Sequence, residues 1–139
     1  MNNVSPKQAL VVEDIHKRFG TLEVLKGISM TAKEGDVTCM IGSSGSGKST
    51  FLRCINLLEI PDSGKVEVSG ELIKMTKDRR GNAKPAEQKQ VDRIRTRLGM
   101  VFQQFNLWKH MTILQNIVEA PIHVQKKPRR EVTDLAATL

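Results

Sequence analysis

The chain has 139 residues and a mass of 15.5 kDa, about the size of one domain. Hydrophobic residues make up 39% of it, which is enough to build a core and excludes wholesale disorder. The formal charge is +7, but nine basic and three acidic residues between Lys74 and Arg97 supply six of those charges. This uneven distribution argues against a DNA-binding protein that is basic throughout, and indicates a local solvated or partner-facing surface.

The sequence shows neither a membrane-spanning run nor a secretion signal. The longest purely apolar run near the start covers only residues 9–12, far short of a bilayer span. Residues 1–6 lack the charged-then-apolar pattern of a signal peptide, so we expect a cytoplasmic protein. The two cysteines, Cys39 and Cys54, fall on an expected strand and an expected helix. We predict that both are reduced and buried.

The first part of the chain is predicted to be rich in strands. Apolar residues alternate loosely within the first two segments, and a turn at residues 61–64 precedes a half-buried strand. Residues 37–41 form a short apolar run of the kind that a buried parallel strand makes. The expected strands are 10–19, 24–31, 37–41 and 65–69, the last continued by Leu72 and Ile73.

The strongest motif lies between the strand expected at 37–41 and a helix expected from about residue 51 to residue 58. It fits G-x-x-x-x-G-K-S/T without a mismatch and consists of Gly42, Ser43, Ser44, Gly45, Ser46, Gly47, Lys48 and Ser49, followed by Thr50. In such a loop, consecutive N–H groups turn inward around one anion, which needs the positive φ that glycine permits. The lysine brings charge to the phosphates, and the serine hydroxyl can ligate Mg²⁺. A flexible Gly/Ser turn that happens to contain a lysine would not explain both flanks.

The second half of the chain is predicted to be mostly helical. Polar residues 76–85 are expected to form an exposed loop, and a helix begins at about Ala86. A strand is expected at 98–102 and a loop at 106–109. A short helix at 113–120 should stop at Pro121, and 128–139 is a further helix candidate.

Taken in order, these motifs resemble the ATP-binding subunit of an ABC transporter, most like those of polar-amino-acid (histidine-type) uptake systems. Residues 24–29 match the segment ahead of the phosphate loop, and residues 42–50 match the Walker A motif. Val101-Phe102-Gln103-Gln104-Phe105-Asn106-Leu107 matches the Q-loop, and residues 111–117 match the helix beyond it. The basic stretch before the Q-loop indicates the amino-acid group.

The resemblance implies an α/β fold of the P-loop NTPase type. This chain would be the N-terminal portion of an ABC nucleotide-binding domain, with the antiparallel β part and an incomplete central sheet. The partial domain, residues 1–139, would comprise a β-rich part with the phosphate loop and first helix (1–73), a basic insertion and helix (74–100), the Q-loop region (101–120) and the start of the helical subdomain (121–139).

The resemblance also implies the site residues and cofactors, which are ATP and Mg²⁺. Phe19 would stack on the adenine, residues 42–50 would bind the phosphates, and Lys48 would take part in catalysis. Gln103 would be catalytic and, together with Ser49, would ligate the metal. Two alternatives remain open: Phe19 could belong to the core, and Gln103 could be an ordinary amide at a strand end.

The implied function is ATP binding and hydrolysis that powers import of a polar amino acid. The subunit would form a homodimer on the cytoplasmic face of the plasma membrane, against membrane-spanning permease subunits. Trp108 would dock a permease helix, or else lie buried and anchor its loop. The basic stretch is expected to be a solvated face. The alternative is that it attracts anionic lipid headgroups or a membrane partner.

The pattern also departs from the family. Residues 104–139 contain no L-S-G-G-Q segment, no strand ending in Asp-Glu and no match to the switch histidine. We therefore expect this chain to bind nucleotide but to be incomplete for hydrolysis. A non-hydrolysing nucleotide-binding or regulatory module is one alternative. An ABC-type ATPase acting on nucleic acid through the basic stretch is another, although we do not expect a nucleic-acid partner.

Overall fold

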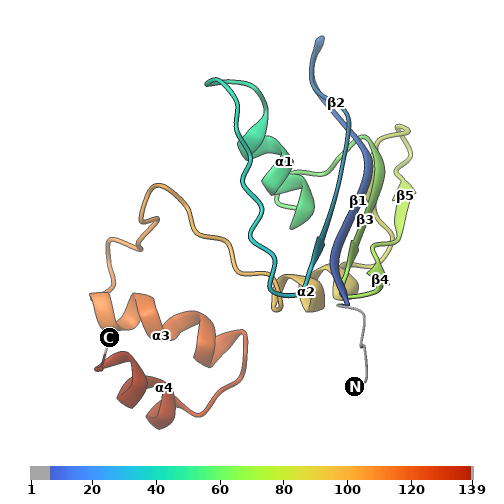
Figure 1. Cartoon of the computed structure of the whole chain (residues 1–139). Coiled ribbons are helices and arrows are strands. Elements are labelled where there is room, and N and C mark those ends of the chain that lie inside the picture. The colour runs from blue at the N-terminus through green and yellow to red at the C-terminus, as the bar shows by residue number, and fades with distance from the viewer. Residues whose placement is uncertain (1–6, 139) are drawn as a thin grey trace, which may run out of the picture. The chain divides into compact units, whose positions relative to one another are not determined.

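The computed structural model describes residues 7–138, and the chain divides into two units, Met1–Arg95 and Thr96–Leu139 (Figure 1). Residues 1–6, where the sequence predicts no secretion signal, lie outside the described residues, as does Leu139. Among the described helices, none is long and apolar enough to cross a membrane.

The first unit is built on an antiparallel sheet with the strand order β2-β1-β3-β4. Its strands are β1 (Gln8–Phe19), β2 (Leu22–Lys33), β3 (Ser63–Val68) and β4 (Glu71–Leu72). The strands predicted at 10–19, 24–31 and 65–69 are confirmed. The continuation through Leu72 and Ile73 is wrong, because Ser69 and Gly70 have positive φ angles and reverse the chain, so that Leu72 pairs back with Glu67.

The same unit also contains two helices, α1 (Lys48–Ile55) and α2 (Gln88–Arg95). Figure 1 shows α1 beside β2, and Phe51 and Cys54 of α1 are buried together with core residues of the sheet such as Ile15. The Arg95 side chain donates hydrogen bonds to the carbonyls of Asn56 (3.0 Å) and Leu57 (2.6 Å), just beyond α1. These bonds fasten α2 to the end of the helix that begins in the glycine motif.

The segment predicted as an exposed loop, residues 76–85, is in fact largely a hairpin. It pairs β5 (Met75–Lys77) with β6 (Ala83–Pro85). The Asp78 carboxylate holds the turn by accepting hydrogen bonds from the backbone N–H groups of Arg80 (2.8 Å) and Asn82 (2.9 Å). The pKa of the Asp78 carboxyl is lowered, mainly by its hydrogen bonds from the backbone and side chain of Asn82. The polar composition of this segment did not indicate a strand pair, because a side chain stabilises its turn and no hydrophobic pattern marks its strands.

Two predicted strands are absent. Residues 37–41 and 98–102 have no strand assignment, and Val37 (98% exposed) and Ile41 (92% exposed) lie in solvent. A strand requires a hydrogen-bonded neighbour, and no strand of the described residues pairs with either segment. The prediction that Cys39 is buried is wrong for the same reason, whereas Cys54 is buried as predicted.

The second unit contains α3 (Ile113–His123) and α4 (Arg129–Ala136), which pack together. Thr112 and Gln115 form a capping box at the start of α3: the Thr112 hydroxyl accepts from the Gln115 N–H (3.2 Å), and the Gln115 side chain accepts from the Thr112 N–H (2.7 Å). The helix predicted at 113–120 is confirmed, and the candidate at 128–139 is a helix over Arg129–Ala136, with Leu139 outside the described residues. Pro121 does not stop α3, since a proline in the last turn removes only one helical hydrogen bond before the helix ends at His123.

The two thiols should differ sharply in reactivity. Cys39 is exposed, whereas Cys54 is fully buried, and burial raises its pKa to about 11. At pH 8, Ellman's reagent should therefore titrate one thiol per native chain and two per unfolded chain. Cys39→Ser should abolish the native reaction. Rapid modification of both thiols in the native chain would contradict this packing.

Burial of Cys54 also predicts a pH dependence of stability. An unfolded chain releases the thiol proton near the ordinary value of 9.0, whereas the native chain keeps it until about pH 11. The unfolded state then binds fewer protons between these values, so the free energy of unfolding should fall as pH rises through that window. Urea unfolding at several alkaline pH values measures this fall, which should be shallower in Cys54→Ala. An identical pH dependence in both proteins would contradict it.

Candidate functional site

The glycine motif leads directly into helix α1. Gly47, the residue before α1, has a φ of +91°, and Lys48 is the first helical residue. The N–H groups of the first helical turn have no partner within the helix, so they face the loop that precedes it. Together with the helix dipole they favour an anion at this point. The predicted passage from loop to helix is confirmed, although the strand expected before the loop is absent.

Lys48 is held over the loop by the loop's own oxygens. Its ammonium donates hydrogen bonds to the carbonyls of Gly42 (2.6 Å) and Ser43 (2.6 Å), and to the Ser46 hydroxyl (3.2 Å). These three contacts curl residues 42–48 around a single positive charge. The lysine ammonium therefore lies against the loop, at the opening of α1, and its binding to phosphate stays a prediction.

The loop packs closely against strand β2, and this packing requires glycine at position 47. A Cβ atom on Gly47 would lie 3.0 Å from side-chain carbons of both Val24 and Leu25, and 3.2 Å from the Val24 carbonyl oxygen. Gly45 also has a positive φ, +79°, but a Cβ there would meet nothing within 4 Å. The two glycines thus differ: Gly45 serves only backbone conformation, whereas Gly47 also permits a close approach.

An open cavity of about 390 Å³ lies at the mouth of this loop. The residues around it include a lysine, three serines and a threonine, several of them at the start of helix α1. The lining residues are Val24, Ser44, Gly45, Ser46, Gly47, Lys48, Ser49 and Thr50. Such a set of donors suits a phosphate chain, and Ser49 supplies a hydroxyl oxygen of the kind that Mg²⁺ accepts as a ligand.

Phe19 lies at the end of β1, near the glycine motif. It pairs with Leu22 at the start of β2, and Val24 of the cavity lining is two residues further along that strand, about 7 Å at the usual rise. The Phe19 side chain is 48% exposed, so the alternative that it is a core residue is wrong. Its position leaves the ring accessible to a planar ligand. Stacking on adenine remains a prediction.

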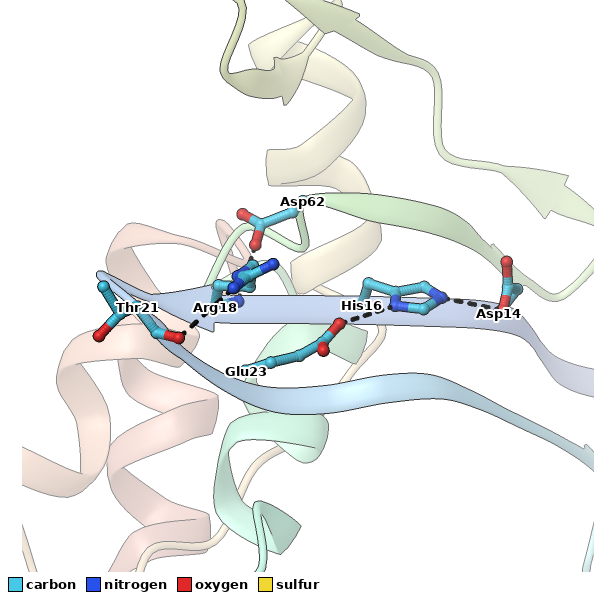
Figure 2. Close-up of polar contacts among 6 residues, drawn as sticks. All are labelled: Asp14, His16, Arg18, Thr21, Glu23 and Asp62. Atoms are coloured by element: carbon cyan, nitrogen blue, oxygen red, sulfur yellow. Dashed lines mark hydrogen bonds and ion pairs between the residues drawn. The ribbon is translucent and has the colours of Figure 1, made fainter.

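The strand that carries Phe19 is fastened by polar contacts close to it (Figure 2). The Asp62 carboxylate accepts a hydrogen bond from the Arg18 backbone N–H (2.7 Å), and the Asp62 N–H donates to the His16 carbonyl (2.9 Å). The His16 ring lies between the carboxylates of Asp14 (3.1 Å) and Glu23 (3.5 Å), the latter on β2. The end of the hairpin is therefore fixed from two sides before any ligand binds.

Gln103 belongs to the other unit, Thr96–Leu139, and is exposed in an irregular segment. The alternative that it is an ordinary amide at a strand end is wrong, because residues 98–102 do not form a strand. Its role as a catalytic residue and Mg²⁺ ligand stays a prediction.

Trp108 is half-exposed, so the alternative of a buried anchor is wrong. Its loop is instead held by Asn116 of α3, whose side chain accepts from the Trp108 N–H (2.8 Å) and donates to the carbonyls of Trp108 (3.2 Å) and Thr112 (2.9 Å). Asn116 was not among the residues predicted from the sequence. An amide one turn into a capped helix, just after a short loop, is the signal that could have found it.

The basic stretch is only partly a free surface. Arg93 pairs with Glu71, Lys74 lies 3.7 Å from Glu87, and Arg95 bonds to the carbonyls beyond α1. The remaining cations on the β5–β6 hairpin, such as Arg79 and Arg80, are exposed. Part of the charge therefore serves packing within the unit, which weakens the nucleic-acid reading.

The contrast between Gly47 and Gly45 can be tested by replacing each with alanine. Gly45→Ala adds only a left-handed alanine and should cost about 1 kcal/mol of unfolding free energy. Gly47→Ala adds the same strain and also crowds Val24 and Leu25, so it should cost roughly 2 kcal/mol or more. Urea unfolding of the two variants compares them directly. Equal costs would mean that the loop does not pack on β2 as described.

Residues 25–139 match the family model described as "ABC transporter". The nopaline permease ATP-binding protein P of Agrobacterium fabrum is 58% identical over 127 residues, which cover 91% of this chain and 49% of that protein. The histidine/lysine/arginine/ornithine transport ATP-binding protein HisP of Escherichia coli is 54% identical over 127 residues, with the same coverage of each chain. The chain spans about half the length of the curated relatives it matches.

Solved structures agree with the sequence relatives. The dimeric structure of MJ0796, a bacterial ABC transporter cassette, matches with a TM-score of 0.76 and 26% identity, covering 93% of this chain and 54% of that one. A dimeric post-hydrolysis state of the same cassette, bound to ADP and Pi, matches with a TM-score of 0.75 and 28% identity over the same shares. The fold is thus that of part of an ABC nucleotide-binding domain, as predicted, and the chain belongs to the ABC transporter family of ATP-binding proteins.

Proposed function

We propose that this chain is the nucleotide-binding part of an ATPase subunit that powers import of a polar amino acid. One observation carries the proposal: in a member of the ABC family, the Lys48 ammonium lies over a glycine loop, and serine and threonine residues at a helix start line the adjoining cavity. The names of the relatives include histidine, arginine, ornithine, nopaline and octopine transport, which supports a polar amino acid or a derivative as cargo.

Each part of Mg-ATP has a candidate partner in the chain. The N–H groups of residues 42–50 and the Lys48 ammonium would bind the phosphates, the Ser49 hydroxyl would hold Mg²⁺, and Phe19 would carry the adenine. Bound Mg²⁺ would neutralise charge that develops on the transferred phosphoryl group. The chain would contribute mainly positioning, and the loop oxygens that fix the Lys48 ammonium support this.

Hydrolysis needs more than this cavity provides. No carboxylate is among the residues that line it, so the lining offers neither an acidic Mg²⁺ ligand nor a base for the attacking water. Gln103 is the candidate for orienting that water. Residues 1–139 alone should therefore bind nucleotide with little turnover, and a non-hydrolysing nucleotide-binding module is the second candidate function.

The proposed partners are membrane-spanning permease subunits and a second copy of the ATP-binding subunit, with the protein peripheral on the cytoplasmic face of the inner membrane. The relatives named as permease ATP-binding proteins support the first partner, and the dimeric cassettes support the second. Within the second unit, Trp108 presents a large half-exposed ring from a loop fastened by Asn116. A rigid exposed aromatic is a suitable anchor for a permease helix.

Replacing Lys48 tests the proposal directly. Loss of a charge-assisted contact should lower affinity for Mg-ATP by about 10- to 100-fold in Lys48→Ala. Titration calorimetry measures this, with thermal unfolding as a check on the fold. Lys89→Ala is the matched control, because Lys89 is an exposed lysine on α2, outside the cavity lining, and should bind as the parent does. Equal binding by Lys48→Ala and the parent, or no binding by the parent, would reject the proposal.

A further inference from the structure

Lys17 has a role that the glycine motif does not reveal. It lies on β1 two residues before Phe19, and its ammonium lies over the Phe19 ring although the pairing with β2 is irregular between Lys17 and Arg18. Its side chain is only 11% exposed, which is unusual for a lysine. A cation in such a place needs partners that fix it.

The ammonium of Lys17 has three kinds of partner. It lies 2.8 Å from the Glu59 carboxylate and donates a hydrogen bond of 2.7 Å to the Ile60 carbonyl, with the Asp62 carboxylate further away at 3.8 Å. It also lies over the Phe19 ring, 5.2 Å from the centroid. That distance is within the range of a cation–π interaction, which is stronger where the cation is shielded from water.

These contacts connect the Phe19 ring with the helix that opens at the glycine loop. Glu59 follows α1, and its backbone N–H donates to the carbonyl of Arg53 within α1 (3.1 Å). The same helix begins at Lys48. The Phe19 ring is therefore connected to the glycine loop through Lys17, Glu59 and helix α1.

We propose that Lys17 is a positioning residue for nucleotide binding, which presets the Phe19 ring as a platform for the base. The inference rests on the proposed function and adds a residue to it. The ammonium lies over one face of the ring, and Phe19 as a residue is still 48% exposed, which leaves room for stacking. Removing the cation frees the ring rotamer and should weaken binding of the base while leaving binding of the phosphates unchanged.

The test compares two ligands by titration calorimetry on the 139-residue chain: Mg-ATP, which has a base, and Mg-tripolyphosphate, which has none. Lys17→Met should lower affinity for Mg-ATP by about 3- to 10-fold and change tripolyphosphate affinity less than about 2-fold. Lys17→Arg retains a cation and should restore ATP affinity. Arg18→Met is the matched control, because Arg18 is a cation next to Phe19 in the chain whose guanidinium donates to the Thr21 carbonyl (3.4 Å). It should bind both ligands as the parent does.

A double mutant separates positioning from general damage. Phe19→Ala should lower ATP affinity by itself, and Lys17→Met should then add nothing, because the ring through which it acts is gone. If Lys17→Met does not fold, Glu59→Gln weakens the anchor and should give a smaller loss that is still confined to ATP.

The outcomes distinguish this inference from the proposed function. Equal losses for both ligands in Lys17→Met, or no loss for either, would overturn the positioning role while Phe19→Ala still weakens ATP binding. An unchanged ATP affinity in Phe19→Ala would overturn the platform itself, and the positioning role with it. A parent chain that binds neither ligand would overturn the proposed function and everything that rests on it.

Discussion

The approach of Gly47 to strand β2 is the constraint on which the rest of the site depends. A backbone without a side chain at this point lets the loop lie against Val24 and Leu25, and the same residue turns the chain into α1. Burial of Phe51 and Cys54 then anchors the helix in the core of the sheet. Because loop, helix and hairpin share this one packed region, the charge of Lys48 and the ring of Phe19 are both placed relative to β2.

The second organising contact is electrostatic. Lys17 is a mostly buried cation among two carboxylates, a carbonyl and an aromatic ring. Its charge favours the thiolate of Cys54, but the effect of burial is larger, so the pKa of Cys54 is raised. Removing one partner of such a group usually costs more than the pair contributes, since a charge is left without compensation. Polar contacts therefore fix the end of the β1–β2 hairpin, and Asp62 contributes both its carboxylate and its backbone N–H.

Features that depend on neighbouring residues could be predicted from the sequence, and features that depend on distant partners could not. The glycine loop, the start of α1, and strands β1 to β3 follow from local spacing, and the structure has them. The segments 37–41 and 98–102 have the composition of strands but lack a described strand to pair with, so Val37 and Ile41 remain in solvent. The β5–β6 hairpin was missed because Asp78, rather than a hydrophobic pattern, closes its turn. The link between Lys17 and Glu59 joins residues 42 positions apart, which no local pattern predicts.

The central claim is that backbone N–H groups of residues 42–50 converge on a phosphate chain beside Lys48. Amide NMR of the labelled chain during titration with Mg-ATP examines those groups one by one. The account predicts that the largest shifts fall on residues 44–50, with a second, smaller group around Phe19 that is absent when tripolyphosphate replaces ATP. Shifts concentrated on the basic β5–β6 hairpin, with residues 44–50 unmoved, would contradict it.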